Sequence, residues 1–125
     1  MAHAQCLSAR KGRILVEKGD SVGGVFIVLD GTLRVFGMNS RGKEATLYWI
    51  QNQEACFFSI NCIFSDLLYP AWVAVESRLA EVAVIPAKIY SSLFTKEIEI
   101  QKYTFDNLAP TVLNLMARLD HKLYP

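Results

Sequence analysis

Two cysteines on either side of a short apolar segment are the most reactive side chains in this sequence. Cys56 and Cys62 flank the residues FFSIN, and cysteine thiolates ligate haem or iron–sulfur clusters and undergo reversible oxidation. Free cysteine is also a small, commonly buried apolar residue. Three interpretations therefore stay open for this pair: packing in the core, which we favour, thiol redox sensing, and metal or haem binding.

Few other side chains are candidates for catalysis or metal binding. A third cysteine, Cys6, makes the set odd and leaves it without a CxxC pair, which argues against a disulfide scaffold. The two histidines, His3 and His121, lie near opposite ends of the chain, whereas zinc-hydrolase and cupin sites bring several His and carboxylate ligands together. No serine lies in a nucleophile elbow. We predict that the protein is not an enzyme and has no metal site; His121, with Cys56 and Cys62, is the alternative ligand set.

The composition is that of one globular domain. A length of 125 residues fits a single domain, and 52% hydrophobic with 20% charged residues excludes disorder. Thirteen Lys and Arg against twelve Asp and Glu leave a net charge of +1, which gives no basic surface for nucleic acid or an anionic membrane. No apolar segment approaches the ~20 residues that span a bilayer, and the first residues lack the apolar segment of a secretory signal. We expect a cytoplasmic protein.

Short β-rich segments separated by turn residues occupy the first two-thirds of the sequence. Asp30-Gly31 lies between residues 25–29 (VFIVL) and 32–36 (TLRVF), and Asp-Gly between two β-rich segments is a strong hairpin signal. A second turn at residues 39–42 leads into a strand over 44–50.

A less regular stretch follows, in which we expect a loop over residues 54–64. Residues 71–76 and 79–85 are then predicted to form another strand pair.

Helices are predicted from Pro86 onwards, because proline is favourable at the first position of a helix. Residues 87–94 place Ile89, Tyr90, Leu93 and Phe94 on one face. Thr95 is the expected N-cap of a second helix, with a kink at Pro110. The fold class is therefore mainly β, a β-sandwich or jelly roll with helices at its C-terminal end.

The last helix carries a regular apolar stripe. In this helix we expect Ile98, Tyr103 and Phe105 to cover the jelly roll. The later residues recur at spacings of three and four, the pattern of a helix that packs on another helix. Because soluble monomers rarely expose such a stripe, we predict a homodimer through this helix. The predicted interface residues are Val112, Leu115, Met116, Leu119 and Leu123.

The order of these elements resembles a known family. The segments GVFIVLDGTLRVF (residues 24–36) and YPAWVAVE (residues 69–76) are similar to the effector domain of the Crp/Fnr transcription regulators. The resemblance runs from about Arg13 to Leu123. It implies a single effector-binding domain over 1–125: a cyclic-nucleotide-binding-like jelly roll (double-stranded β-helix) over about 13–85, then helices over about 86–123, the last a long dimerisation helix. In the family a helix-turn-helix domain follows, so DNA contact is expected only through a domain missing from this chain.

The sequence departs from the family at the nucleotide site. In nucleotide-binding members a Gly-Glu pair contacts the ribose, and an Arg followed by Ser or Thr pairs with the cyclic phosphate. Here Phe58-Ser59 falls where Gly-Glu belongs and Tyr69-Pro70 where that Arg belongs, and no Lys or Arg occurs from residue 54 to 77. The predicted effector site is apolar and rich in sulfur. Its residues are Cys56, Phe57, Phe58, Ser59, Cys62, Tyr69 and Trp72.

These observations predict the ligand- or redox-sensing domain of a Crp/Fnr-type transcription regulator that does not respond to cAMP. The alternatives are a cyclic-nucleotide-binding module of another signalling protein and a haem- or metal-based gas sensor. A jelly-roll enzyme of cupin type is disfavoured by the missing His cluster. No cofactor is expected, with haem as the alternative.

Overall fold

The strands form two facing sheets in the computed structural model, which describes residues 5–65 and 67–108. A three-stranded sheet has the order β1-β7-β3, and a four-stranded sheet has the order β2-β6-β4-β5. All the described pairings are antiparallel. The strands are β1 (Gln5–Arg10), β2 (Ile14–Val16), β3 (Gly24–Asp30), β4 (Leu33–Met38), β5 (Glu44–Ile50), β6 (Trp72–Val75) and β7 (Leu79–Pro86).

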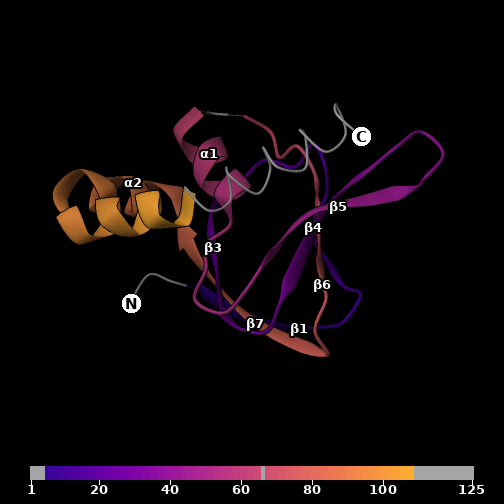
Figure 1. Ribbon diagram of the computed structural model, residues 1–125. Coiled ribbons are helices and arrows are strands. Elements are labelled where there is room, and N and C mark those ends of the chain that lie inside the picture. Colours follow the sequence, from indigo (N-terminus) through magenta and orange to yellow (C-terminus); the bar gives the residue numbers. More distant parts are fainter. Residues whose placement is uncertain (1–4, 66, 109–125) are drawn as a thin grey trace.

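The core lies between the two sheets. Val28 and Val82 of the first sheet and Leu33, Val35 and Val73 of the second are fully or almost fully buried in one cluster. Helices α1 (Phe57–Ser65), α2 (Ala87–Lys96) and the helical residues 98–108 gather on one side of the sheets (Figure 1). The prediction of a mainly β jelly roll with C-terminal helices is confirmed.

The hairpin predicted at Asp30-Gly31 is wrong. β3 pairs with β7 and β4 pairs with β5 and β6, so this turn carries the chain from one sheet to the other. Gly31 has a φ of 105°, and a Cβ there would lie 2.7 Å from the Leu79 carbonyl oxygen. A glycine is therefore required in this turn, as expected, but the turn connects the two sheets and is not a hairpin. The hairpin predicted at residues 39–42 is confirmed, with the Asn39 amide donating to the Lys43 carbonyl over 3.0 Å.

The predicted pairing of the next two strands is also wrong. β6 pairs with β2 and β4, and β7 pairs with β1 and β3. The Ser77 hydroxyl holds the crossing between them, because it accepts from the Thr32 amide (2.9 Å) and donates to the Leu79 carbonyl (2.8 Å). Sequence reasoning recognised both strands but assigned them to one sheet, because strand signals are local and pairing partners are not.

Two elements differ from the expected loops. β1 was not predicted, and it pairs along its whole length with β7. Residues 57–65, expected as part of a loop, form α1. Their aromatic and β-branched side chains lower the intrinsic helix propensity, so packing against β3 and α2 must supply the stability of this helix.

The first C-terminal helix, α2, begins one residue later than expected. Pro86 ends β7 and occupies the N-cap position of α2. Thr95 is not an N-cap: it lies in the last turn of α2, where its hydroxyl donates to the Ser91 carbonyl. Ile98 and Phe105, expected to cover the jelly roll, are 78% and 60% exposed. Pro110, His121 and the five predicted interface residues lie outside the described residues.

Candidate functional site

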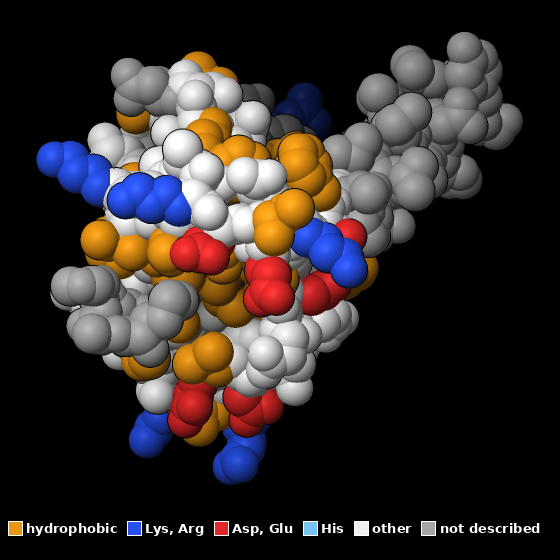
Figure 2. Space-filling view, turned by 90° about the vertical axis from the view of Figure 1, so that its left-hand side faces the viewer, with side chains coloured by type: hydrophobic (Ala, Val, Ile, Leu, Met, Phe, Trp, Pro, Cys, Tyr) orange, Lys and Arg blue, Asp and Glu red, His pale blue; other side chains and the backbone are white. Residues whose placement is uncertain are grey.

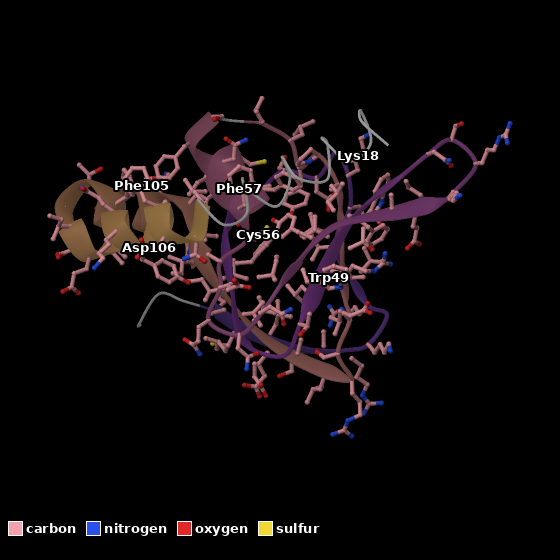
Figure 3. All side chains as sticks on the ribbon, in the orientation of Figure 1. Lys18, Trp49, Cys56, Phe57, Phe105 and Asp106 are labelled. Atoms are coloured by element: carbon pink, nitrogen blue, oxygen red, sulfur yellow. The ribbon has the colours of Figure 1, made fainter. Side chains whose placement is uncertain are left out.

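Two tyrosine side chains from other segments of the chain contact Cys56. Cys56 precedes α1 and is fully buried, and its Sγ lies 2.9 Å from the Tyr69 hydroxyl and 3.6 Å from the Tyr48 hydroxyl. Tyr69 belongs to the segment that leads into β6, and Tyr48 points inward from β5. Figure 3 shows Cys56 beneath α1, between that helix and the sheets. Tyr48 is a site residue that the sequence analysis missed, although strand alternation with exposed Trp49 would have placed it inward.

The aromatic ring of Phe58 completes this cluster. Its ring packs edge-on against Tyr48 at 5.7 Å and against Tyr69 at 5.8 Å between ring centroids, close to the T-shaped geometry that aromatic pairs prefer. The position is therefore filled by the protein's own rings. We call Tyr48, Cys56, Phe58 and Tyr69 the Cys56 cluster.

The two tyrosines of the Cys56 cluster are uncharged at neutral pH. Burial raises the pKa of Tyr48 and of Tyr69 well above the usual value, and proximity to Cys56 raises both further. Burial likewise raises the pKa of the Cys62 thiol. Neutral phenols and thiols form hydrogen bonds but do not compensate a buried anion, so the cluster favours neutral neighbours.

Ser59 ties α1 to β3. It is fully buried, its hydroxyl donates to the Cys56 carbonyl over 2.9 Å, and its oxygen accepts from the Phe26 amide over 3.3 Å. Both bonds are internal, so the hydroxyl is engaged in holding the start of the helix against the sheet.

The two thiols are not placed for a disulfide. Cys62 lies in the second turn of α1 and its thiol donates to the Leu68 carbonyl over 3.6 Å. Six residues of helix rise about 9 Å, beyond the ~7 Å Cα separation that a disulfide spans, so bridging Cys56 to Cys62 would require α1 to unwind. Among residues 5–65 and 67–108, no three His, Cys, Asp or Glu side chains gather in a group that would hold a metal ion.

Trp72 lies apart from the Cys56 cluster. It alternates with buried Val73 on β6, stacks on Phe36 at 6.1 Å, and has the Lys18 Nζ 5.9 Å from its ring, so it lies on the outer face of the four-stranded sheet. The Phe57 ring lies 5.6 Å from that of Phe58 and also lines a cavity between α1 and residues 98–108. The seven predicted residues therefore do not form one site.

A small apolar cavity lies between the sheets. Its volume is about 110 Å³. Its lining residues are Leu7, Arg13, Ile14, Leu15, Val16, Phe26, Leu33, Val73, Val82 and Val84. None of these belongs to the Cys56 cluster.

The helical residues 98–108 are hydrogen-bonded to the segment before Cys56. The Asn107 Oδ1 accepts from the Ala55 amide over 2.8 Å, and the Tyr103 hydroxyl donates to the Gln53 carbonyl over 2.9 Å. Gln53 has a φ of 69°, which is unusual for a residue other than glycine. The two hydrogen bonds tie residues 53 and 55 to residues 103 and 107.

The comparison with protein families decides the assignment. The family model for the cyclic nucleotide-binding domain matches residues 6–97. The chain belongs to this family. A comparison with curated proteins found no match. Within the described residues, no helix is long and apolar enough to span a membrane.

Solved structures with this cyclic nucleotide-binding fold include several transcription regulators. A putative regulator of the Crp/Fnr family from Eubacterium rectale matches with a TM-score of 0.81 and 23% identity, over 95% of this chain and 55% of that one. The c-di-GMP responsive global regulator CLP of Xanthomonas campestris matches with a TM-score of 0.86 and 15% identity, over 98% of this chain and 61% of that one. A transcriptional regulator from Thermotoga maritima matches with a TM-score of 0.79 and 20% identity, over 96% of this chain and 92% of that one. The chain thus spans little more than half the length of the first two, and at these identities the likeness shows the fold.

Proposed function

We propose that this cyclic nucleotide-binding domain is the effector-sensing domain of a Crp/Fnr-type transcription regulator and responds to an uncharged small molecule, not to cAMP. The observation that carries the proposal is the position of Tyr69. It stands where the resemblance places the phosphate-binding Arg, it is almost fully buried, and its hydroxyl contacts the Cys56 Sγ at 2.9 Å.

The charges around this position support an uncharged effector. The sequence has no Lys or Arg from residue 54 to 77, and Ser59 stands where the ribose-binding Glu belongs. A cyclic phosphate buried without a cation would face a desolvation cost of several kcal/mol with nothing to offset it.

The size of the interior cavity supports the same proposal. The cavity between the sheets has a volume of about 110 Å³, less than the ~150 Å³ of an engineered cavity that holds benzene. A purine nucleotide is far larger than benzene, so this cavity would not hold one.

Calorimetric titration with cAMP and with cGMP tests the proposal. We expect no stoichiometric heat at micromolar concentrations, with a nucleotide-binding member of the family as the positive control. A micromolar isotherm with one site per chain would overturn the proposal.

Thiol redox sensing is the weaker candidate. Cys56 is fully buried and hydrogen-bonded to Tyr69, and its disulfide with Cys62 would require α1 to unwind. Both thiols are buried, and burial raises the pKa of Cys62. Reaction with oxidants needs solvent access, which is low at both cysteines, and thiolate character, which is low at Cys62.

Dimerisation and DNA binding belong to the same proposal. The apolar stripe of Val112, Leu115, Met116, Leu119 and Leu123 lies outside the described residues, and we propose that it forms a homodimer seam through which an effector signal reaches a DNA-binding domain. Sedimentation equilibrium of the wild type and of a Leu115→Glu/Leu119→Glu variant tests this. We expect a dimer and a monomer respectively, and a monomeric wild type at tens of micromolar would contradict the proposal.

A further inference from the structure

A second cavity lies outside the sandwich, between the helices. It has a volume of about 260 Å³ and lies where α1, the end of α2 and residues 98–108 meet. Phe57 and Phe105, labelled in Figure 3, come from α1 and from residues 98–108. The lining residues are Phe57, Asn61, Phe64, Phe94, Thr104, Phe105 and Leu108.

Aromatic rings form the walls of this helix cavity. Phe64 and Phe94 lie 5.1 Å apart and Phe94 and Phe105 lie 6.2 Å apart between ring centroids, both at steep angles. Phe64 and Phe105 nevertheless remain 46% and 60% exposed. Figure 2, seen from the side of α2, shows apolar side chains exposed among charged ones on this face. The rings therefore have apolar surface left to bury against a ligand.

The lining residues specify the chemistry of that ligand. No Lys, Arg, Asp or Glu of the described residues lines the helix cavity, so nothing among them compensates a charged ligand. Its polar side chains are Thr104 and Asn61. The Thr104 hydroxyl is already bonded to the Tyr90 hydroxyl and the Ile100 carbonyl, whereas the amide of exposed Asn61 lies at the wall of the cavity. One polar group on an otherwise apolar ligand would meet this amide.

The volume sets the size of the ligand. An engineered cavity of about 150 Å³ holds benzene, so a volume of about 260 Å³ has room for two fused rings. Ligand pockets of this kind combine apolar and aromatic walls with a few placed polar groups.

We propose that the helix cavity binds an uncharged aromatic molecule of about two fused rings, with a hydroxyl or amide group directed at Asn61. Ligand binding itself does not depend on the proposed sensing function; only the effect of the ligand on the rest of the protein rests on it. A ligand held between Phe57 and Leu108 bridges α1, which begins beside Cys56, and the helical residues 98–108. It would therefore bias the position of the segment that leads to the proposed dimer seam.

Titration of the full chain with 2-naphthol, followed by amide NMR, tests the inference. We expect saturable shifts at the Asn61 side-chain amide and at residues 104–108. Phe105→Ala removes one of the aromatic rings that line the cavity. It should weaken binding roughly tenfold, because an aromatic contact contributes about that much to affinity. Ile98→Ala is the matched control, because Ile98 is an exposed apolar residue of the same helical segment and does not line the cavity; its affinity should equal that of the wild type.

A second variant keeps the test independent of the stability of Phe105→Ala. Asn61→Trp, at an exposed position of α1, fills the helix cavity and should abolish binding. Absence of saturable binding to the wild type, equal affinity in Asn61→Trp, or shifts centred on Tyr48 and Tyr69 would each overturn the inference. These outcomes are separate from the proposed function, which the cyclic nucleotide titration decides.

Discussion

The Tyr69 hydroxyl lies 2.9 Å from the Cys56 Sγ in the interior of the domain. This contact joins the segment before β6 to the segment before α1. Tyr69, at the position to which the sequence resemblance assigns a phosphate-binding Arg, is part of an aromatic and sulfur core.

Removing the Tyr69 hydroxyl should destabilise the protein. We expect Tyr69→Phe to lower the free energy of unfolding by about 1 kcal/mol, the net value of a typical buried hydrogen bond. Urea denaturation measures the loss, and an unchanged free energy of unfolding in Tyr69→Phe would contradict the hydrogen bond to Cys56.

The same tyrosines should make the protein lose stability at alkaline pH. Burial raises the pKa of Tyr48 and Tyr69, whereas an unfolded tyrosine loses its proton near pH 10, at about its unperturbed pKa. Above that pH the unfolded state binds fewer protons than the native state, so the free energy of unfolding falls as pH rises. Urea midpoints from neutral to strongly alkaline pH should show this decline. It should be shallower in a Tyr48→Phe/Tyr69→Phe variant, and an unchanged slope would refute the assignment.

The crossing between the sheets should tolerate no side chain at Gly31. Gly31→Ala combines a positive φ with a Cβ 2.7 Å from the Leu79 carbonyl oxygen. At Gly12, where φ is 91°, an added Cβ would have no described atom within 4 Å, so Gly12→Ala carries only the backbone cost of roughly 1–2 kcal/mol. We expect Gly31→Ala to cost more by about 1–3 kcal/mol, because the added methyl group overpacks its surroundings. Thermal or urea unfolding compares the two, and equal losses would argue against a close approach at Gly31.

Asn107 should hold the segment before Cys56 against residues 98–108. Asn107→Ala leaves the amide of buried Ala55 without this acceptor, which should cost about 1–3 kcal/mol and speed exchange of that amide with solvent. Asp106→Ala, at the neighbouring exposed position labelled in Figure 3, is the control and should change stability by less than about 0.5 kcal/mol. Unchanged exchange at Ala55 in Asn107→Ala would show that this bond does not couple the two segments.

The local sequence was sufficient to predict most strands and the helical C-terminal part. Residues 25–29 and 44–50 are β-rich and bounded by turn residues, and Pro86 marks the change to helix. These signals depend on the conformational preferences of neighbouring residues. The absence of Lys and Arg from residue 54 to 77 was likewise visible in the sequence.

Strand pairing and the composition of the site were decided by tertiary structure. Asp30-Gly31 has the same local chemistry in a hairpin and in a crossing between sheets, and only contacts with Leu79 and Ala80 distinguish them. The helical state of residues 57–65 depends on packing that overrides weak propensity. Trp72 lies on the outer face of the four-stranded sheet, whereas Tyr69, three positions earlier, and Tyr48 of β5 are buried in the core. Which side chains meet depends on long-range contacts, and no local pattern encodes those.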